Sequence, residues 1–227
     1  TVAWNWKANG AGSANTDGDI NSTVSANTTS GFSIVSYTGT LSSAGNPTIG
    51  HGLGVAPEVI ITKSKSNAEN WGVYHTSLPA NHILQLNTNA SKINSASAGT
   101  LTAPTSSVFT VNYQGEWGNS GQNYIAYVFA PIKGFSKFGS YQGNGNADGS
   151  FIYTGFKPAW VLVKRYDSGS EDWNMWDNKR IGYNIIGNDK LYADLNSVED
   201  TGASEIDILS NGFKWRTTNG GLNASGG

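Results

Sequence analysis

Residues 124–130 of this 227-residue chain read YIAYVFA, a run in which aromatic and aliphatic side chains alternate. A period of two predicts a β-strand with one face against a core. The chain opens on a similar run, TVAWNWK, and three of its positions match: Ala3 with Ala126, Trp4 with Tyr127 and Trp6 with Phe129. Residues 223–227, NASGG, likewise parallel residues 119–123, NSGQN, which precede the strand. We therefore expect the second half of the chain to lack a strand that the first half contains.

Other segments of the first half recur in the second half in the same order. The matched pairs are residues 31–33 with 134–136, 52–63 with 154–164, 70–75 with 172–177, and 106–111 with 211–216. Gly, Asn and Pro bound these short apolar runs, and no segment holds the 3.6-residue period of an amphipathic helix. We predict an all-β fold with almost no helix, built as two tandem antiparallel β-sandwich units, jelly-roll-like, from an internal repeat.

The repeat also predicts boundaries. Residues 1–8 form a strand that completes a neighbouring unit or the second unit, residues 9–30 form a Gly/Asn/Ser/Thr-rich linker, and the two sandwich repeats occupy residues 31–133 and 134–227. Within the repeats, residues 59–61 (VII) and 160–163 (WVLV) are continuous apolar runs, which predict central strands covered on both faces. Each run is followed by a polar turn and an alternating run, which predicts an antiparallel hairpin.

The composition argues against several classes of partner. Charged residues make up only 13% of the chain and the net charge is −2, so no field for nucleic acid or acidic membranes is expected. No apolar run approaches the roughly 20 residues of a membrane span, so we expect no membrane insertion. Cysteine is absent, which excludes disulfides and thiolate metal sites.

Two sets of polar residues are candidates for metal sites. Residues 17–21, DGDIN, place oxygen side chains at alternate positions, but the 12-residue calcium loop would need a Glu at its end and a differently placed Gly, so an Asx turn is the preferred interpretation. The three histidines, His51, His75 and His82, form no paired zinc-ligand motif. We expect structural or solvent-exposed histidines, no metal and no cofactor.

Catalysis would require a nucleophile with its base or a pair of carboxylates. Glu171, Asp172 and Asp177 gather in the second hairpin, where carboxylates beside a tight turn are normally solvated. No GxSxG motif is present. We predict that the chain is not an enzyme.

The aromatic side chains admit two roles: stacking platforms for sugar rings, or core filling in sandwiches that lack Leu-rich helices. The residues in question are Trp71, Tyr74, Trp117, Trp173, Trp176 and Trp215. Alternation favours the core for most of them. Trp117 lies in a Gly-rich turn without a periodic partner, so we expect it to be exposed, and we take Trp117 and Trp176 as candidate glycan contacts.

Six segments together resemble a known family: VAWNWKANGAG, GFSIVSYTGT, GHGLGVAPEVIITK, GFSKFGSYQGNG, FIYTGFKPAWVLVKR and DILSNGFKWR. They resemble the duplicated β-domain of tail-fibre and other virion proteins of marine bacteriophages, and the resemblance covers essentially the whole chain. In that family a YIYMAF-like strand follows NASGG. The resemblance implies an extracellular virion location and a structural or adhesive role in a fibre, with self-association and attachment to a host-surface glycan or protein. The alternatives are a carbohydrate-binding module and, more weakly supported, a glycan-degrading enzyme.

The opening residues give the sharpest structural hypothesis. An unfilled position in a sheet leaves backbone groups unpaired. Residues 1–7 can close the second unit of the same chain, can be donated to a neighbouring copy to build a head-to-tail filament, or can cap the first unit or an upstream one. We favour donation between chains, with Val2, Trp4 and Trp6 as the assembly residues.

Overall fold

The computed structural model describes residues 3–180, 189–201 and 204–227. The chain divides into two compact units: unit 1 comprises residues 1–85 and 93–138, and unit 2 comprises residues 86–92 and 139–227. Strand accounts for 34% of the structure and helix for 3%, which confirms the all-β prediction. The helical content consists of a 3-10 turn, η1 (Ala96–Ala98), and one turn of α-helix, α1 (Gly220–Asn223).

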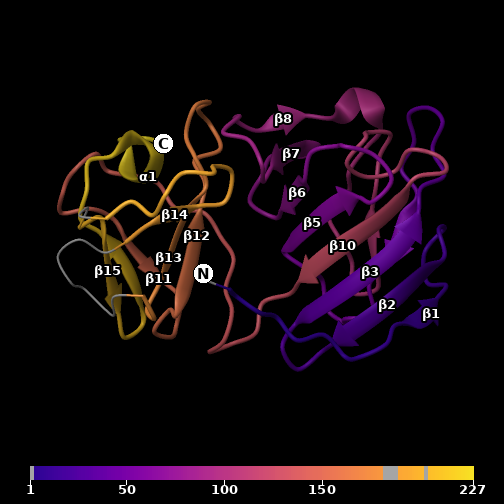
Figure 1. Cartoon of the computed structure of the whole chain (residues 1–227), viewed down its shortest axis with the longest axis horizontal. Helices are drawn as coiled ribbons and strands as arrows, with labels where there is room; N and C mark the ends of the chain where they lie inside the picture. Colours follow the sequence, from indigo (N-terminus) through magenta and orange to yellow (C-terminus); the bar gives the residue numbers. More distant parts are fainter. Residues whose placement is uncertain (1–2, 181–188, 202–203) are drawn as a thin grey trace. The chain divides into compact units, whose positions relative to one another are not determined.

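Unit 1 is built on a large antiparallel sheet (Figure 1). Its strands, in spatial order, are β1 (Ser13–Asn15), β2 (Ser22–Asn27), β3 (Phe32–Thr38), β10 (Asn123–Phe129), β5 (Val59–Ser64), β6 (Gly72–His75), β7 (His82–Gln85) and β8 (Ile93–Asn94). A second layer consists of β4 (Thr48–Gly50) and β9 (Val108–Thr110). The central position belongs to β10, which pairs with β3 on one side and β5 on the other.

The alternating pattern of β10 explains the core of unit 1. Tyr124, Ala126 and Val128 point inward and are fully buried. They join a hydrophobic cluster that includes Ile49 of β4 and Phe109 of β9, so the two layers share one core. Strand β10 thus pairs with both β3 and β5, and its inward side chains share a core with β4 and β9.

Unit 2 contains two smaller antiparallel sheets. One has the order β11 (Phe151–Tyr153), β16 (Gly212–Trp215), β15 (Ile206–Leu209), and the other has β12 (Trp160–Val163), β13 (Asn174–Asp177), β14 (Leu191–Tyr192). Val161 of β12, Trp176 of β13 and Trp215 of β16 lie in one buried cluster, so side chains from both sheets form a common core. Both units are therefore layered and sandwich-like.

Two boundary predictions were wrong. Residues 9–30 are not a linker, because they supply β1 and β2 to the sheet of unit 1. Ile20 and Val24 are buried there, and the Ser22 hydroxyl donates to the Gly50 carbonyl oxygen at 3.2 Å. Hydroxyl and amide side chains that hydrogen-bond locally allow a polar sequence to enter a sheet.

The division between the units also differs from the predicted one. It falls after residue 138 instead of residue 133, and residues 86–92 pack with unit 2. One contact that holds the latter segment is the hydrogen bond from the Lys92 amide to the Tyr166 carbonyl oxygen, 2.8 Å long. An alignment of the two halves cannot show that residues 86–92, which lie within the first half, pack with unit 2.

Residues 3–9 lie outside any strand, so the expected strand over the opening residues is not observed there. Trp6 is 43% exposed and meets Phe129 edge-on, with ring centroids 5.9 Å apart. The Asn27 side-chain amide donates to the Lys7 carbonyl oxygen at 3.0 Å. These contacts hold the opening residues on unit 1. Val2 lies outside the described residues.

Candidate functional site

The hairpin of β12 and β13 reproduces the hairpin of β5 and β6. Ile60 pairs with Tyr74 in unit 1, and Val161 pairs with Trp176 in unit 2. Both registers follow from the sequence match. The next bonds along the two ladders also correspond: the Thr76 amide donates to the Glu58 carbonyl oxygen at 2.9 Å, and the Asn178 amide donates to the Ala159 carbonyl oxygen at 3.0 Å. In unit 2, β12 therefore occupies the position that β5 occupies in unit 1.

Residues 223–227 make the same backbone bonds in unit 2 that residues 118–122 make in unit 1. The matched bonds are Gly39 N to Gln122 O (2.8 Å) with Gly143 N to Gly227 O (3.0 Å), and Leu41 N to Gly118 O (2.9 Å) with Gly145 N to Asn223 O (2.7 Å). Gly121 and Gly226 both have a φ of 76°. The match is shifted by one residue from the sequence alignment, so Gly227 corresponds to Gln122, the last residue before β10.

A tyrosine anchors each of these segments. The Tyr37 hydroxyl donates to the Trp117 carbonyl oxygen at 2.8 Å, and the Tyr141 hydroxyl donates to the Leu222 carbonyl oxygen at 2.6 Å. Burial raises the pKa of both hydroxyls, so each remains a donor. Three separate features, the hairpin, the closing segment and the tyrosine, now define corresponding positions in the two units.

The units differ at the position of β10. In unit 1, β10 lies between β3 and β5 (Figure 1). Among the described residues of unit 2, β12 pairs with β13 alone, and residues 139–150, which include the counterparts of the second half of β3, form no strand. The prediction that residues 160–163 form a central strand was therefore wrong, whereas β5 is central as predicted. An apolar run that is covered on one side only has the same sequence signature as a central strand.

The hydrogen bonds between β12 and β13 determine which residues of β12 direct their backbone groups away from β13. The bond between Ala159 and Asn178 fixes Val161 and Val163 as the residues that exchange hydrogen bonds with β13. In an antiparallel ladder the intervening residue directs its N–H and C=O to the opposite side. That residue is Leu162, and its counterpart Ile61 pairs with Tyr127 of β10.

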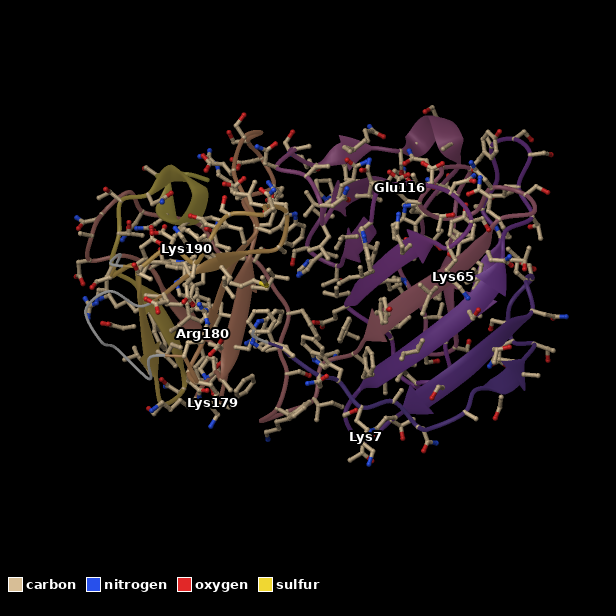
Figure 2. All side chains as sticks on the ribbon, in the orientation of Figure 1. Lys7, Lys65, Glu116, Lys179, Arg180 and Lys190 are labelled. Atoms are coloured by element: carbon tan, nitrogen blue, oxygen red, sulfur yellow. The ribbon has the colours of Figure 1, made fainter. Side chains whose placement is uncertain are left out.

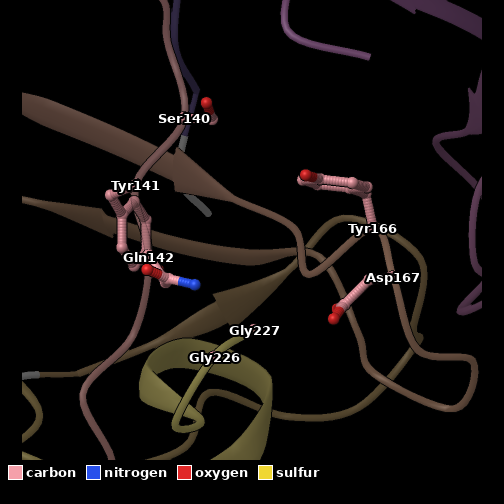
Figure 3. Close-up of a pocket in the computed structure, with 7 residues that line it drawn as sticks. All are labelled: Ser140, Tyr141, Gln142, Tyr166, Asp167, Gly226 and Gly227. Atoms are coloured by element: carbon pink, nitrogen blue, oxygen red, sulfur yellow. The ribbon is translucent and has the colours of Figure 1, made fainter. Parts of the chain in front are cut away.

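A cavity of about 330 Å³ opens beside this edge (Figure 3). The residues that line it are Ser140, Tyr141, Gln142, Tyr166, Asp167, Gly226 and Gly227. Figure 3 shows the Tyr166 ring across the cavity from Tyr141 and Gln142, with Gly226 and Gly227 below them. The lining thus combines the counterparts of Tyr37 and of residues 121–122.

In unit 1, Tyr124 packs beside Tyr37, the counterpart of Tyr141. Its ring stacks on Tyr37 with centroids 5.2 Å apart. Its hydroxyl lies 2.9 Å from the Gly115 carbonyl oxygen and accepts from the Asn119 amide at 3.1 Å. Burial raises the pKa of Tyr124 to about 12. In unit 2 the Gly220 carbonyl oxygen, the counterpart of that of Gly115, accepts from Arg165 Nη1 at 3.0 Å, so the Arg165 side chain reaches the group that the Tyr124 hydroxyl contacts in unit 1.

Charged groups surround the cavity at its rim. Arg165 Nε donates to Asp167 Oδ1 at 2.7 Å, and this bond lowers the pKa of the Asp167 carboxyl. The Lys92 ammonium lies 5.1 Å from the centroid of the Tyr166 ring. These contacts place a cation over the Tyr166 ring and an ion pair at Asp167.

The two predicted glycan contacts are buried. Trp117 and Trp176 are each 1% exposed, so the expectation that Trp117 is exposed was wrong and neither ring offers a face to a sugar. A side chain added at Gly72 would lie 2.9 Å from the Trp117 ring, and Trp176 meets Trp215 edge-on at 5.4 Å. The Gly-rich turn brings the Trp117 ring inward because Gly72 leaves room for it.

Sequence reasoning missed a different aromatic pair. Phe151 and Tyr153 of β11 are 47% and 58% exposed. They stand two residues apart, so both lie on the same face of the strand. The signal was present in the alternation of residues 151–153, FIY, but the member that packs, partly buried, against the core is the aliphatic Ile152.

The acidic residues are engaged in structural contacts. Asp19 accepts from the Thr48 amide and hydroxyl at 2.9 and 2.8 Å, which lowers the pKa of its carboxyl. Burial opposes ionisation of Asp177, but hydrogen bonds from Arg180 and the Lys179 amide lower its pKa on balance. Across the described ranges, no three His, Cys, Asp or Glu side chains gather as metal ligands would.

A second ion pair lies inside unit 2. Lys190 is buried and its ammonium donates to Glu205 at 2.8 Å, which ties the start of β14 to the start of β15. Figure 2 shows Lys190 and Arg180 among the packed side chains of this unit. Burial lowers the pKa of Lys190, but the bond to Glu205 outweighs it and the pKa is raised.

The histidines also have structural roles. His51 is fully buried, with Nε2 3.2 Å from the Thr105 carbonyl oxygen and Nδ1 accepting from the Leu53 amide at 3.2 Å. His75 Nδ1 accepts from the Ser77 amide at 3.0 Å. The neutral imidazole satisfies both patterns, and burial lowers the pKa of both rings.

One family model matches residues 1–227, and its description is "Domain of unknown function (DUF7483)". No curated protein and no solved structure matches this chain. No helix in the described residues has the length and apolar character needed to cross a bilayer.

Proposed function

We propose that this chain, which belongs to the DUF7483 family, is a non-catalytic structural and adhesive module of a bacteriophage virion fibre, a tail fibre or a similar extracellular appendage. The ordered motifs that resemble virion β-domains support this proposal. So does the β-rich architecture, because appendages are commonly built from repeated β modules whose sheets continue from one subunit to the next. Its partners are further copies or neighbouring subunits and a host-surface glycan or protein.

The observation that carries the proposal is the open edge of β12 in unit 2. In unit 1 the same edge is covered by β10, whereas in the described part of unit 2 it is paired on one side only. Proteins normally protect such an edge, because it pairs readily with another chain. An edge of this kind can be covered by a further strand, either from the same polypeptide or from a neighbouring subunit.

The location can be tested on particles. Antibodies raised against residues 1–227 should label an extended appendage when virions from the source of this sequence are examined by immunogold electron microscopy. Purified chain should also form oligomers whose size grows with concentration in light scattering. Labelling confined to host material, together with a strictly monomeric chain, would contradict the proposal.

The sequence predicts that residues 1–8 act in assembly. Trp6 contacts the Phe129 ring and the Lys7 carbonyl oxygen accepts from the Asn27 side chain, so both residues contact unit 1. This arrangement supports the case in which the opening segment caps the first unit. A chain that lacks residues 1–8 distinguishes the cases: assembly is abolished if Val2, Trp4 and Trp6 are donated to a neighbour, and persists if they cap unit 1.

A second candidate function is carbohydrate binding, and the exposed pair on β11 favours it. Phe151 and Tyr153 present two rings on one strand face, as platforms for sugar stacking do. Tyr153→Ala and Phe151→Ala should then each weaken binding on a glycan array. Phe135→Ala is the matched control, because Phe135 is 59% exposed but belongs to unit 1. Absence of any glycan signal for the unaltered chain would remove this candidate.

A further inference from the structure

One buried position of unit 2 carries a charge where unit 1 carries a hydrocarbon. Strands β7 and β14 follow the two matched hairpins and pair with β6 and β13. Their registers match Leu84 with Leu191, and therefore Ile83 with Lys190. Ile83 is fully buried and Lys190 is 4% exposed. Because the desolvation of a buried ion pair often costs as much as the attraction returns, stability alone does not explain a lysine at this position.

The lysine and an asparagine side chain bind the two oxygens of one carboxylate. Lys190 Nζ donates to Glu205 Oε2 at 2.8 Å, and Asn219 Nδ2 donates to Glu205 Oε1 at 3.1 Å. Glu205 is 7% exposed. A carboxylate in this place can take a proton from the ammonium and deliver it to the carboxamide nitrogen, as a general base and then a general acid.

The oxygen of the same carboxamide is bound as well. Asn219 is the residue before α1, and its Oδ1 accepts from the Gly221 amide at 2.8 Å. A backbone N–H that points at a carbonyl oxygen polarises the carbonyl carbon and stabilises negative charge that develops on the oxygen. Asn219 itself lies at the surface, so a nitrogen released from its side chain can pass into solvent.

Two further groups face the Lys190 ammonium in the described part of the chain. Asp200 Oδ2 lies 3.5 Å from Nζ on a side chain that is 41% exposed, and the centroid of the Tyr192 ring lies 5.2 Å away. The contact with Asp200 is longer and better solvated than the bond to Glu205, so it is the weaker of the two. Glu205 is therefore the group that exchanges a proton with Lys190.

We propose that Lys190, Glu205 and Asn219 form an intramolecular isopeptide bond, an amide between Lys190 Nζ and Asn219 Cγ that closes with loss of ammonia. This modification does not depend on the function proposed above. It would join the two sheets of unit 2, because Lys190 precedes β14 of one sheet and Asn219 follows β16 of the other. Such a bond restricts the unfolded chain as a disulfide does, in a chain that has no cysteine.

The reaction balances within these groups. Glu205 takes a proton from the Lys190 ammonium, and the free amine attacks Asn219 Cγ while the Gly221 N–H stabilises the oxyanion. The bond between Cγ and Nδ2 then breaks. Of the three protons of the ammonium, one stays on the new amide nitrogen, and Glu205 passes the other two to the departing nitrogen, which leaves as ammonium. No oxidant or second reactant is consumed.

Mass spectrometry of the whole purified chain under denaturing conditions tests the proposal. The chain should weigh less than its calculated mass by one ammonia, and a tryptic digest should contain a branched peptide in which Lys190 and Asn219 are joined. Lys190→Arg and Glu205→Gln should each restore the full mass and abolish the branched peptide. Lys214→Arg is the matched control, because Lys214 Nζ lies 2.7 Å from a carboxylate oxygen of Asp148 in the same unit; this variant should keep the branched peptide.

A surface variant separates the reaction from folding. Asn219→Ser leaves the buried pair of Lys190 and Glu205 in place and keeps a side-chain oxygen for the Gly221 amide, so unit 2 should still fold. It removes the carboxamide, so the chain should have its full calculated mass. Without the bond its melting temperature should be lower by about 10 °C than that of the unaltered chain.

Asn219 also has a competing route to the same mass. Gly220 follows it, and attack of the Gly220 backbone nitrogen on Cγ gives a succinimide with loss of ammonia. That product does not involve Lys190, so it would persist in Lys190→Arg and give no branched peptide. The proposal is wrong if the unaltered chain has its full calculated mass, if the loss of ammonia survives Lys190→Arg, or if the chain loses water instead and the branched peptide joins Lys190 to Asp200.

Discussion

At the scale of single residues, two glycines beside the closing segments are tightly constrained. A Cβ at Gly39 would lie 2.4 Å from the Asn119 carbonyl oxygen, and a Cβ at Gly143 would lie 2.2 Å from the Ala224 carbonyl oxygen. Backbone cannot yield as a flexible side chain does, so both positions need glycine for close approach. In both units a tyrosine (Tyr37 or Tyr141) therefore provides a hydroxyl anchor two residues before a glycine (Gly39 or Gly143) that provides a site of backbone contact.

Gly143→Ala should lower the free energy of unfolding of unit 2 by about 1–3 kcal/mol, because the added methyl group forces residues 223–227 away. Gly139→Ala is the matched control, since a Cβ there meets nothing within 4 Å. Chemical denaturation of both variants checks the prediction. Equal stability of the two variants would show that the closing segment is not held where we describe it.

The buried histidines predict how stability depends on pH. Burial lowers the pKa of His51 and His75 below the ordinary value of 6.5. The unfolded chain therefore takes up protons at a higher pH than the folded chain. Their contribution to stability is fully present above pH 6.5 and is lost as the pH falls through the lowered values. The free energy of unfolding should decline over this interval.

Replacement of one imidazole isolates this effect. His51→Gln should remove part of the pH dependence below pH 6.5, whereas His82→Gln retains both buried imidazoles and should keep it. Denaturation curves at a series of pH values provide the measurement. A slope that is identical in the His51 variant and the unaltered chain would contradict the account.

At the scale of elements, the two faces of β12 should respond differently to proline. Val161 exchanges bonds with Trp176 and is buried, so Val161→Pro should destabilise unit 2 by about 3 kcal/mol or more. Leu162→Pro removes no bond to β13 and should cost clearly less. Equal loss of stability in the two variants would mean that the N–H of Leu162 is already engaged.

Much at this scale could be predicted from the sequence. Alternation and turn residues located both hairpins, and the match of residues 52–63 with 154–164 gave the registers of β5–β6 and β12–β13. The sequence could not reveal that residues 9–30 contain strands, because hydroxyl and amide groups of that segment are satisfied within the fold. The burial of Trp117 depends on space left by Gly72, a contact distant in sequence.

At the scale of the whole molecule, the central claim is that in the described part of unit 2 β12 pairs with β13 alone, whereas in unit 1 β10 covers the corresponding edge of β5. A cavity lined by Tyr141 and Tyr166 also opens in unit 2. The tandem repeat remains a prediction, supported by the shared pairings of the two units. The cavity could not be predicted from sequence, because it is formed by three separate segments.

Hydrogen exchange at Leu162 tests the central claim most directly. The account predicts fast exchange of this amide in the unaltered chain and slow exchange when residues 123–130 are appended after Gly227, while the amides of β5 stay protected in both. Slow exchange at Leu162 in the unaltered chain, or no change on adding the strand, would contradict it.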